Sequence, residues 1–158
     1  MHHVAEGYDA EILLRWGDPI TADAPDFDVM NQTAAAQLGQ FGYNNDYVGF
    51  TALNEAGTRG LLCVNHEYTN EEVMFPGLGR QDKQAFAGMT PELIDIEMAA
   101  HGGTVVEIEK ETTGAWRVER GGKYNRRITP LNTAMTISGP AAGHARVKSN
   151  ADPEGMTI

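Results

Sequence analysis

The sequence Gly-Leu-Leu-Cys-Val-Asn-His-Glu-Tyr-Thr-Asn-Glu-Glu, residues 60–72, indicates a buried strand that ends in a polar cluster. Its apolar run, Leu61–Val64, is typical of a short strand that is buried on both faces. Asn65, His66 and Glu67 follow directly, and the alternation of side chains along a strand predicts that Asn65 and Glu67 share one face while His66 takes the other. A carboxylate at the end of a buried strand is costly unless a cation meets it. The alternative is that Glu67 emerges at the surface where the strand ends.

A hairpin is predicted over about residues 47–68, because a second apolar run, Tyr47–Leu53, precedes this strand and a turn at 54–58 separates the two. An antiparallel pair places the start of its first strand beside the end of its second. The oxygen-bearing side chains of Asn44, Asn45 and Asp46 are therefore expected to meet residues 65–67 at one edge of the sheet. Ca²⁺ prefers carboxylate and amide oxygens, so residues 44–46 and 65–67 at this edge are a candidate site for a hard cation. The alternative is an ordinary Asn- and Asp-rich turn.

A second hairpin is predicted over about residues 104–120, with a turn at 111–114. Between the hairpins, Thr90 as N-cap and Pro91 in the first turn predict a helical insertion over about 90–101. Two hairpins in series form a four-stranded antiparallel meander, which predicts a mainly β fold that forms part of a β-propeller, with short helical insertions. A small sandwich and a free-standing sheet are the alternatives.

The remaining segments give weaker signals. A strand is predicted over residues 4–16, where 10–16 carry the apolar content, and residues 31–38 predict a short helix. Residues 69–90 are interpreted as an excursion rich in Gly, Pro and charge. Residues 128–158 read as loop. The chain is expected to be one unit over residues 1–158.

The acidic composition limits the classes of partner. The chain has 22 acidic and 12 basic residues and a formal net charge of −10, which disfavours nucleic acid and an anionic membrane surface. No apolar run approaches the roughly 20 residues of a membrane span, so no membrane partner is expected. Five basic residues gather in 117–127 and include Arg126 and Arg127, so this cluster is a candidate anion site, with a solvated loop as the alternative.

Several dispersed motifs resemble those of the PhoX-type alkaline phosphatases. They lie in order along nearly the whole chain, and they are Glu6-Gly7-Tyr8, Arg15-Trp16-Gly17-Asp18-Pro19, Phe41-Gly42-Tyr43-Asn44-Asn45-Asp46, Val64-Asn65-His66-Glu67-Tyr68-Thr69-Asn70-Glu71-Glu72, Met98-Ala99-Ala100-His101-Gly102-Gly103, Tyr124-Asn125-Arg126-Arg127-Ile128-Thr129 and Ser138-Gly139-Pro140-Ala141-Ala142-Gly143-His144. None of the motifs is specific alone, but together they are.

The resemblance implies a secreted or periplasmic enzyme, built on a β-propeller, that hydrolyses phosphate monoesters with a calcium and iron cluster. The leader that such enzymes carry is absent from this sequence. Within the resemblance, Glu67, Asp46 and Asn45 are the expected metal ligands. Residues expected in phosphate binding or in support of the ligands are Asn44, Asn65, His66, Arg126, Arg127 and His144, although the resemblance gives no individual role to Arg126, Arg127 or His144.

The chain departs from the family in length, because members run to several hundred residues. The family's iron-binding cysteine belongs to a later motif, and Cys63 does not match it. The expected role is therefore the N-terminal part of the phosphatase, inactive alone and with catalytic residues not assigned. The alternative is a calcium-stabilised propeller segment that acts as a non-enzymatic binding or structural module. Self-association through exposed sheet edges is also expected.

Overall fold

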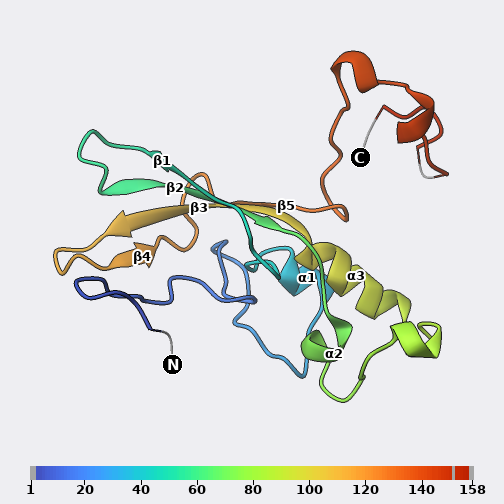
Figure 1. Cartoon of the computed structure of the whole chain (residues 1–158), viewed down its shortest axis with the longest axis horizontal. Helices are drawn as coiled ribbons and strands as arrows, with labels where there is room; N and C mark the ends of the chain where they lie inside the picture. Colours follow the sequence, from blue (N-terminus) through green and yellow to red (C-terminus); the bar gives the residue numbers. More distant parts are fainter. Residues whose placement is uncertain (1–2, 151, 157–158) are drawn as a thin grey trace.

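The computed structural model describes residues 3–150 and 152–156 and contains one open antiparallel sheet of five strands (Figure 1). Its strands are β1 (Val48–Ala52), β2 (Arg59–His66), β3 (Gly102–Lys110), β4 (Trp116–Val118) and β5 (Arg126–Ile128). The order is β1-β2-β3-β4, and β5 pairs with β3 on the same side as β4. The predicted mainly β, antiparallel fold is confirmed, whereas closure into a propeller is not observed within these residues.

Both predicted hairpins are present in the one sheet. In the first, Val48 of β1 lies opposite Val64 of β2. The turn between them is fixed by Asn54, whose side-chain oxygen accepts hydrogen bonds from the backbone N–H groups of Thr58 and Arg59. Local turn chemistry of this kind explains why the hairpin was readable from sequence.

Short helices fill the connections, as α1 (Ala34–Gln37), α2 (Glu71–Met74), α3 (Pro91–Ala100) and the 3-10 helices η1 (Asp82–Gln84), η2 (Gly139–Ala141) and η3 (Ala145–Val147). The predicted insertion is α3: the Thr90 hydroxyl accepts a hydrogen bond from Leu93 N–H, and Pro91 opens the first turn. Gly102 then turns the chain into β3 with φ of 98°, a conformation that favours glycine.

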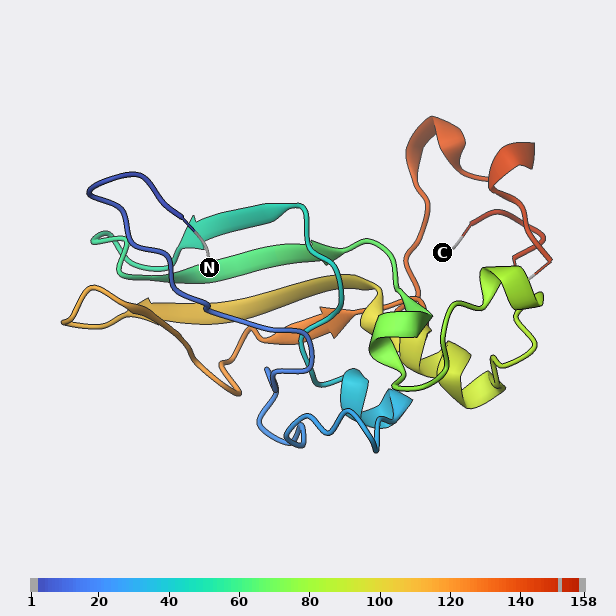
Figure 2. The same ribbon diagram turned by 60° about the horizontal axis from the view of Figure 1, so that its bottom comes forward.

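Two buried clusters hold the fold. The first lies on the sheet face that carries Val64, Val106 and Ile108, and it is closed by Ile20 and Phe41. The N-terminal segment runs across this face in Figure 2 and packs Leu13 and Leu14 against it. The second cluster lies among the helices, as Met74, Phe75, Ile96 and Ala100.

The predicted strand over 4–16 is wrong. This segment has no ladder with any described strand; its apolar side chains contribute packing to the sheet face instead of backbone pairing. The strand β5 was not predicted, because it begins in the basic stretch 117–127, for which the sequence indicated an anion site or a solvated loop. With only three residues and two arginines, it shows no apolar alternation, and it forms because β3 offers it a partner.

The C-terminal part stands away from the sheet and helices in Figure 1. It closes on itself through hydrogen bonds from Ile137 N–H to Met156 O and from Gly143 N–H to Gly155 O. The side chain of Asp152 accepts from the N–H groups of Gly155 and Met156 and stabilises this closure. Within the described residues, no helix combines the length and apolar character that crossing a bilayer requires.

Candidate functional site

The two polar clusters singled out in the sequence lie side by side, and we call residues 44–46 and 65–67 together the oxygen-rich edge. Glu67 N–H donates to Asn44 O at 3.0 Å, and Asn65 N–H donates to Tyr47 O at 3.3 Å. These bonds continue the β1–β2 pairing beyond the start of β1. The hairpin therefore brings together residues that are about 20 positions apart in the sequence.

Asn65 holds this edge together with its side chain. Its Oδ1 accepts from the N–H groups of Asp46 and Tyr47 at 3.2 and 2.8 Å, and its Nδ2 donates to the Asp46 carboxylate. Asn44 adopts φ of 53°, a left-handed conformation that asparagine tolerates better than most residues. The side chains of Asn45, Asp46 and Glu67 are exposed, so Glu67 does emerge where its strand ends.

The oxygen-rich edge has the donor chemistry of a calcium site but not the number of donors. Asp46 and Glu67 supply carboxylates and Asn45 an amide, whereas Ca²⁺ takes roughly six to eight oxygen ligands. Across residues 3–150 and 152–156, no group of three or more His, Cys, Asp or Glu side chains is placed to hold a metal ion. The described residues therefore do not form a complete metal centre.

His66 points away from this edge into the protein. It is 3% exposed, its Nε2 lies 2.6 Å from Thr104 Oγ1, and its ring meets the ring of Phe41 edge-on at 4.9 Å. Burial, reinforced by the charge of Arg127, lowers the pKa of His66 from 6.5 to about 3. The imidazole is therefore neutral at neutral pH and is not exposed to an incoming ligand.

Arg127 is buried at 6% exposure and caps the end of α3. Its Nη2 donates to Ala99 O and His101 O at 2.8 and 2.9 Å, and its Nη1 donates to Thr104 Oγ1 at 2.7 Å. Burial lowers the pKa of Arg127 to about 9, so the guanidinium keeps its charge at neutral pH. The carbonyl end of a helix is a favourable place for that charge.

The other basic residues do not gather into one anion site. Arg126 is exposed and, one position from Arg127 along β5, lies on the other sheet face. Arg117 pairs with Glu109 and Glu119 at 2.7 and 2.6 Å, and His144 accepts from Arg146 N–H on the C-terminal segment. Strand alternation and local carboxylates thus disperse the cluster that looked continuous in sequence.

Two structural residues escaped the sequence reasoning. Glu107 of β3 is fully buried, and its carboxylate accepts from Tyr124 N–H at 3.0 Å and from Arg59 at 2.6 Å. These contacts, with the Tyr124 bond first, hold the pKa of Glu107 below its usual value despite burial. The sequence feature that indicated its burial was the position of Glu107, a single charged residue within the apolar run Val105–Ile108.

Asn125 is the second such residue, and it bridges the gap between β4 and β5 along the edge of β3. Its Oδ1 accepts from Glu107 N–H at 2.7 Å, and its Nδ2 donates to Ile20 O and Glu119 O, each at 2.7 Å. The Asn125 side chain thus accepts the hydrogen bond from Glu107 N–H that a residue of a neighbouring strand would otherwise accept. No sequence pattern within residues 119–126 predicts this role of Asn125.

Two acidic residues, Glu71 and Glu72, open the helix α2 that follows β2. Burial, followed by repulsion from Glu71, raises the pKa of Glu97 on α3, while a hydrogen bond with Thr69 opposes the shift. Burial and the charge of Glu72 likewise raise the pKa of Tyr43. Burial is the main cause of both shifts, and the charges of Glu71 and Glu72 add to it.

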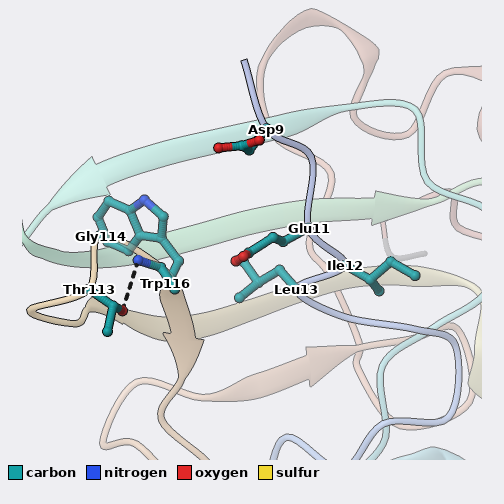
Figure 3. A pocket seen from close by; sticks show the side chains of 8 residues that line it. Asp9, Glu11, Ile12, Leu13, Thr113, Gly114 and Trp116 are labelled. Carbon is teal, nitrogen blue, oxygen red and sulfur yellow. Dashed lines mark hydrogen bonds between the residues drawn. The ribbon is translucent and has the colours of Figure 1, made fainter. Parts of the chain in front are cut away.

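A pocket of about 670 Å³ lies elsewhere, between the N-terminal segment and the β3–β4 turn (Figure 3). Its walls include the acidic Asp9 and Glu11 on one side and Trp116 with Thr113 on the other. A hydrogen bond from Ala115 N–H to the Thr113 hydroxyl fixes the turn. None of the site residues predicted from sequence lines it.

Comparison with known proteins places this chain in a family of phosphatases. The family described as alkaline phosphatase PhoX matches residues 1–158. The chain belongs to the PhoX alkaline phosphatase family. No curated protein matches it.

A solved structure is also similar to this chain, and it is described as Pseudomonas fluorescens PhoX in complex with vanadate, a transition state analogue. It is 36% identical to this chain with a TM-score of 0.82, over 97% of this chain and 25% of that chain. The present chain therefore spans about a quarter of the length of the protein it matches.

Proposed function

We propose that this chain is the N-terminal part of an alkaline phosphatase that hydrolyses phosphate monoesters. The observation that carries the proposal is the match along 97% of the chain to a protein whose structure holds a transition state analogue. At 36% identity, the shared fold and the shared family description point the same way. The rest of the active site would come from a longer protein of the family's length.

The proposed enzyme uses calcium and iron, and the oxygen-rich edge supplies part of its ligand set. Glu67 and Asp46 would each offer a carboxylate and Asn45 an amide oxygen. Bound metal ions would neutralise the charge that develops on a phosphoryl group. The chain's own contribution is to hold these oxygens at one edge through Asn65 and the Asn44–Glu67 bond.

The same proposal includes a propeller and a location outside the cytoplasm. An open meander with unpaired outer strands is the unit from which propeller blades are built. A periplasmic or secreted enzyme would meet phosphate monoesters from outside the cell. Neither nucleic acid nor membrane is a proposed partner, in keeping with the net charge of −10.

A second candidate is a calcium-stabilised binding or structural module without catalysis. It is favoured by the incomplete metal site, since the described residues bring no three acidic, histidine or cysteine side chains together. The two candidates differ in whether a protein of the family's full length, supplied with calcium and iron, hydrolyses phosphate monoesters.

Turnover of p-nitrophenyl phosphate separates the candidates. The 158-residue chain and a protein extended to the family's length would be assayed with saturating calcium and iron. We expect useful turnover only from the longer protein, because a partial ligand set cannot provide the charge stabilisation. Robust turnover by the short chain would contradict the division of the site, and an inactive, metal-loaded long protein would favour the binding module.

A further inference from the structure

Three buried polar residues form a row across three neighbouring strands on one face of the sheet. Arg127 of β5 lies directly opposite Thr104 of β3, and Thr104 is diagonal to His66 of β2. Their exposed fractions are 6%, 1% and 3%. Burial of a polar side chain costs folding free energy unless the side chain is hydrogen-bonded, so the hydrogen bonds along this row matter for stability.

The hydrogen bonds run in one direction along the row. Arg127 can only donate, and its Nη1 donates to Thr104 Oγ1 at 2.7 Å. The Thr104 hydroxyl then has its own hydrogen left for His66 Nε2, at 2.6 Å. In this direction His66 Nε2 accepts and the neutral ring carries its proton on Nδ1, whereas in the other tautomer Nε2–H would donate to the second lone pair of Thr104 Oγ1.

Arg127 itself is fixed by the helix rather than by a carboxylate. None of the ion pairs among the described residues involves it, and two of its four acceptors are the carbonyls of Ala99 and His101 at the end of α3. The row is therefore anchored at one end to a ten-residue helix.

The other end of the row meets the oxygen-rich edge. A Cβ on Gly42 would come within 2.4 Å of the His66 ring, so the chain before Asn44 lies directly against the imidazole. Tyr43 N–H donates to Ala100 O at 3.1 Å, which ties the same stretch to the end of α3. One residue further along each strand, Glu67 N–H bonds to Asn44 O.

We propose that Arg127, acting through Thr104 and His66, is a positioning residue that fixes where Asn44 and Glu67 leave the sheet. The row holds the last residue of β2 in one orientation, and that orientation sets the direction of Glu67, whose N–H bonds to Asn44 O. The positioning of the edge stands on geometry alone; its value for metal binding rests on the proposed function. Arg127, although buried, is thus assigned a role in positioning the oxygen-rich edge.

Amide hydrogen exchange in Thr104→Val and Thr104→Ser variants tests the proposal. Valine keeps the shape of threonine and removes the hydroxyl, whereas serine keeps the hydroxyl. We expect Thr104→Val to speed exchange at the Glu67 amide by about tenfold relative to the Leu53 amide, which bonds to Arg59 O at the far end of the hairpin. Thr104→Ser should retain the protection. Equal acceleration at both amides would indicate general destabilisation and overturn the proposal.

A second measurement does not depend on whether Thr104→Val folds. Nitrogen-15 NMR of the unaltered protein should show His66 Nδ1 protonated and Nε2 unprotonated at neutral pH. A protonated Nε2 would reverse the hydrogen bond to Thr104 and overturn the proposal.

Both measurements are made without metal, so they are independent of the proposed phosphatase. Calcium titration by calorimetry adds the functional arm: weaker binding by Thr104→Val than by Thr104→Ser supports the link between the row and the site. The titration uses a protein of the family's full length, because the described residues alone do not form a complete metal centre. No calcium binding by the unaltered full-length protein would count against the proposed function and leave the positioning result standing. Equal binding by the two variants would remove the link to metal.

Discussion

Glu67 and His66 are neighbours in the sequence with opposite environments, because a strand sends successive side chains to opposite faces. Glu67 is exposed and bonds through its N–H to Asn44 O, and His66 is buried against Thr104. The sequence predicted this division of faces. It could not predict that Arg127 would complete the row, since the strand that carries Arg127 lacks an apolar pattern.

Replacing Glu67 with Gln should lower metal content and phosphatase activity together in a protein of the family's full length. The change keeps the shape of the side chain and removes the charge that a hard cation needs. Stability should change by less than about 0.5 kcal/mol, because the side chain is exposed. Metal analysis and p-nitrophenyl phosphate turnover are the measurements.

Glu72→Gln is the matched control for that variant, since Glu72 is also exposed but lies in α2, beyond the edge. It should leave metal content nearly unchanged. A Glu67→Gln protein with normal metal content and turnover would show that Glu67 is an ordinary residue at a strand end.

His66 should make the fold sensitive to mild acid. Burial lowers its pKa from 6.5 to about 3, so below pH 6.5 the unfolded chain takes up a proton that the folded chain does not. The free energy of unfolding should therefore fall as pH drops, by about 2 kcal/mol between about pH 7.5 and about pH 5 from this residue. Urea denaturation at the two pH values measures the difference.

His66→Gln removes the titrating group and should flatten this pH dependence, even though the variant is less stable overall. His144→Gln, at an exposed histidine, should leave the dependence as it was. A slope that survives in His66→Gln would assign the effect to other groups.

Among the elements, those built from local signals were predicted and those built from distant partners were not. The β1–β2 turn and the N-cap of α3 are encoded within a few residues, by Asn54 and Thr90. The three-residue β5 depends on β3, about 20 positions earlier in the chain. The N-terminal segment has strand-like composition but packs by its side chains, so composition alone could not distinguish packing from pairing.

The corner between α3 and β3 should tolerate only glycine. At Gly102 the backbone has φ of 98°, and an added Cβ would lie 2.0 Å from Ile128 O. Gly102→Ala should lower the free energy of unfolding by more than about 2 kcal/mol, through both strain and displacement of β5. Thermal and urea denaturation measure the loss.

Gly103→Ala is a close control, because its Cβ would meet only Val64 O at an ordinary 3.5 Å and its φ is not in the left-handed range. It should cost little by comparison. Equal losses in the two variants would refute the explanation based on the corner.

At the scale of the whole molecule, the open sheet leaves β1 as an edge. Tyr47 and Leu53 bond toward β2, so the alternate residues Val48, Phe50 and Ala52 turn their backbone groups outward. The strand has no charge or proline to block another strand, and Val48 is 61% exposed. We expect the chain to self-associate through this edge.

Light scattering across protein concentration and salt tests that expectation. Association should increase with salt, because the net charge of −10 makes copies repel one another. Val48→Lys should reduce association at every salt concentration. A monomer at all concentrations, or association that weakens with salt, would contradict pairing through β1.

The bridge made by Asn125 has a consequence for the order in which the molecule assembles. Its bond to Ile20 O spans 105 positions, whereas each hairpin closes locally, so the hairpins should form early and the N-terminal segment should dock late. A late-docking segment is also the first to detach. Limited proteolysis of Asn125→Ala should therefore cut within residues 3–20 well before the hairpins, and uniform cleavage along the chain would argue against such a sequence of events.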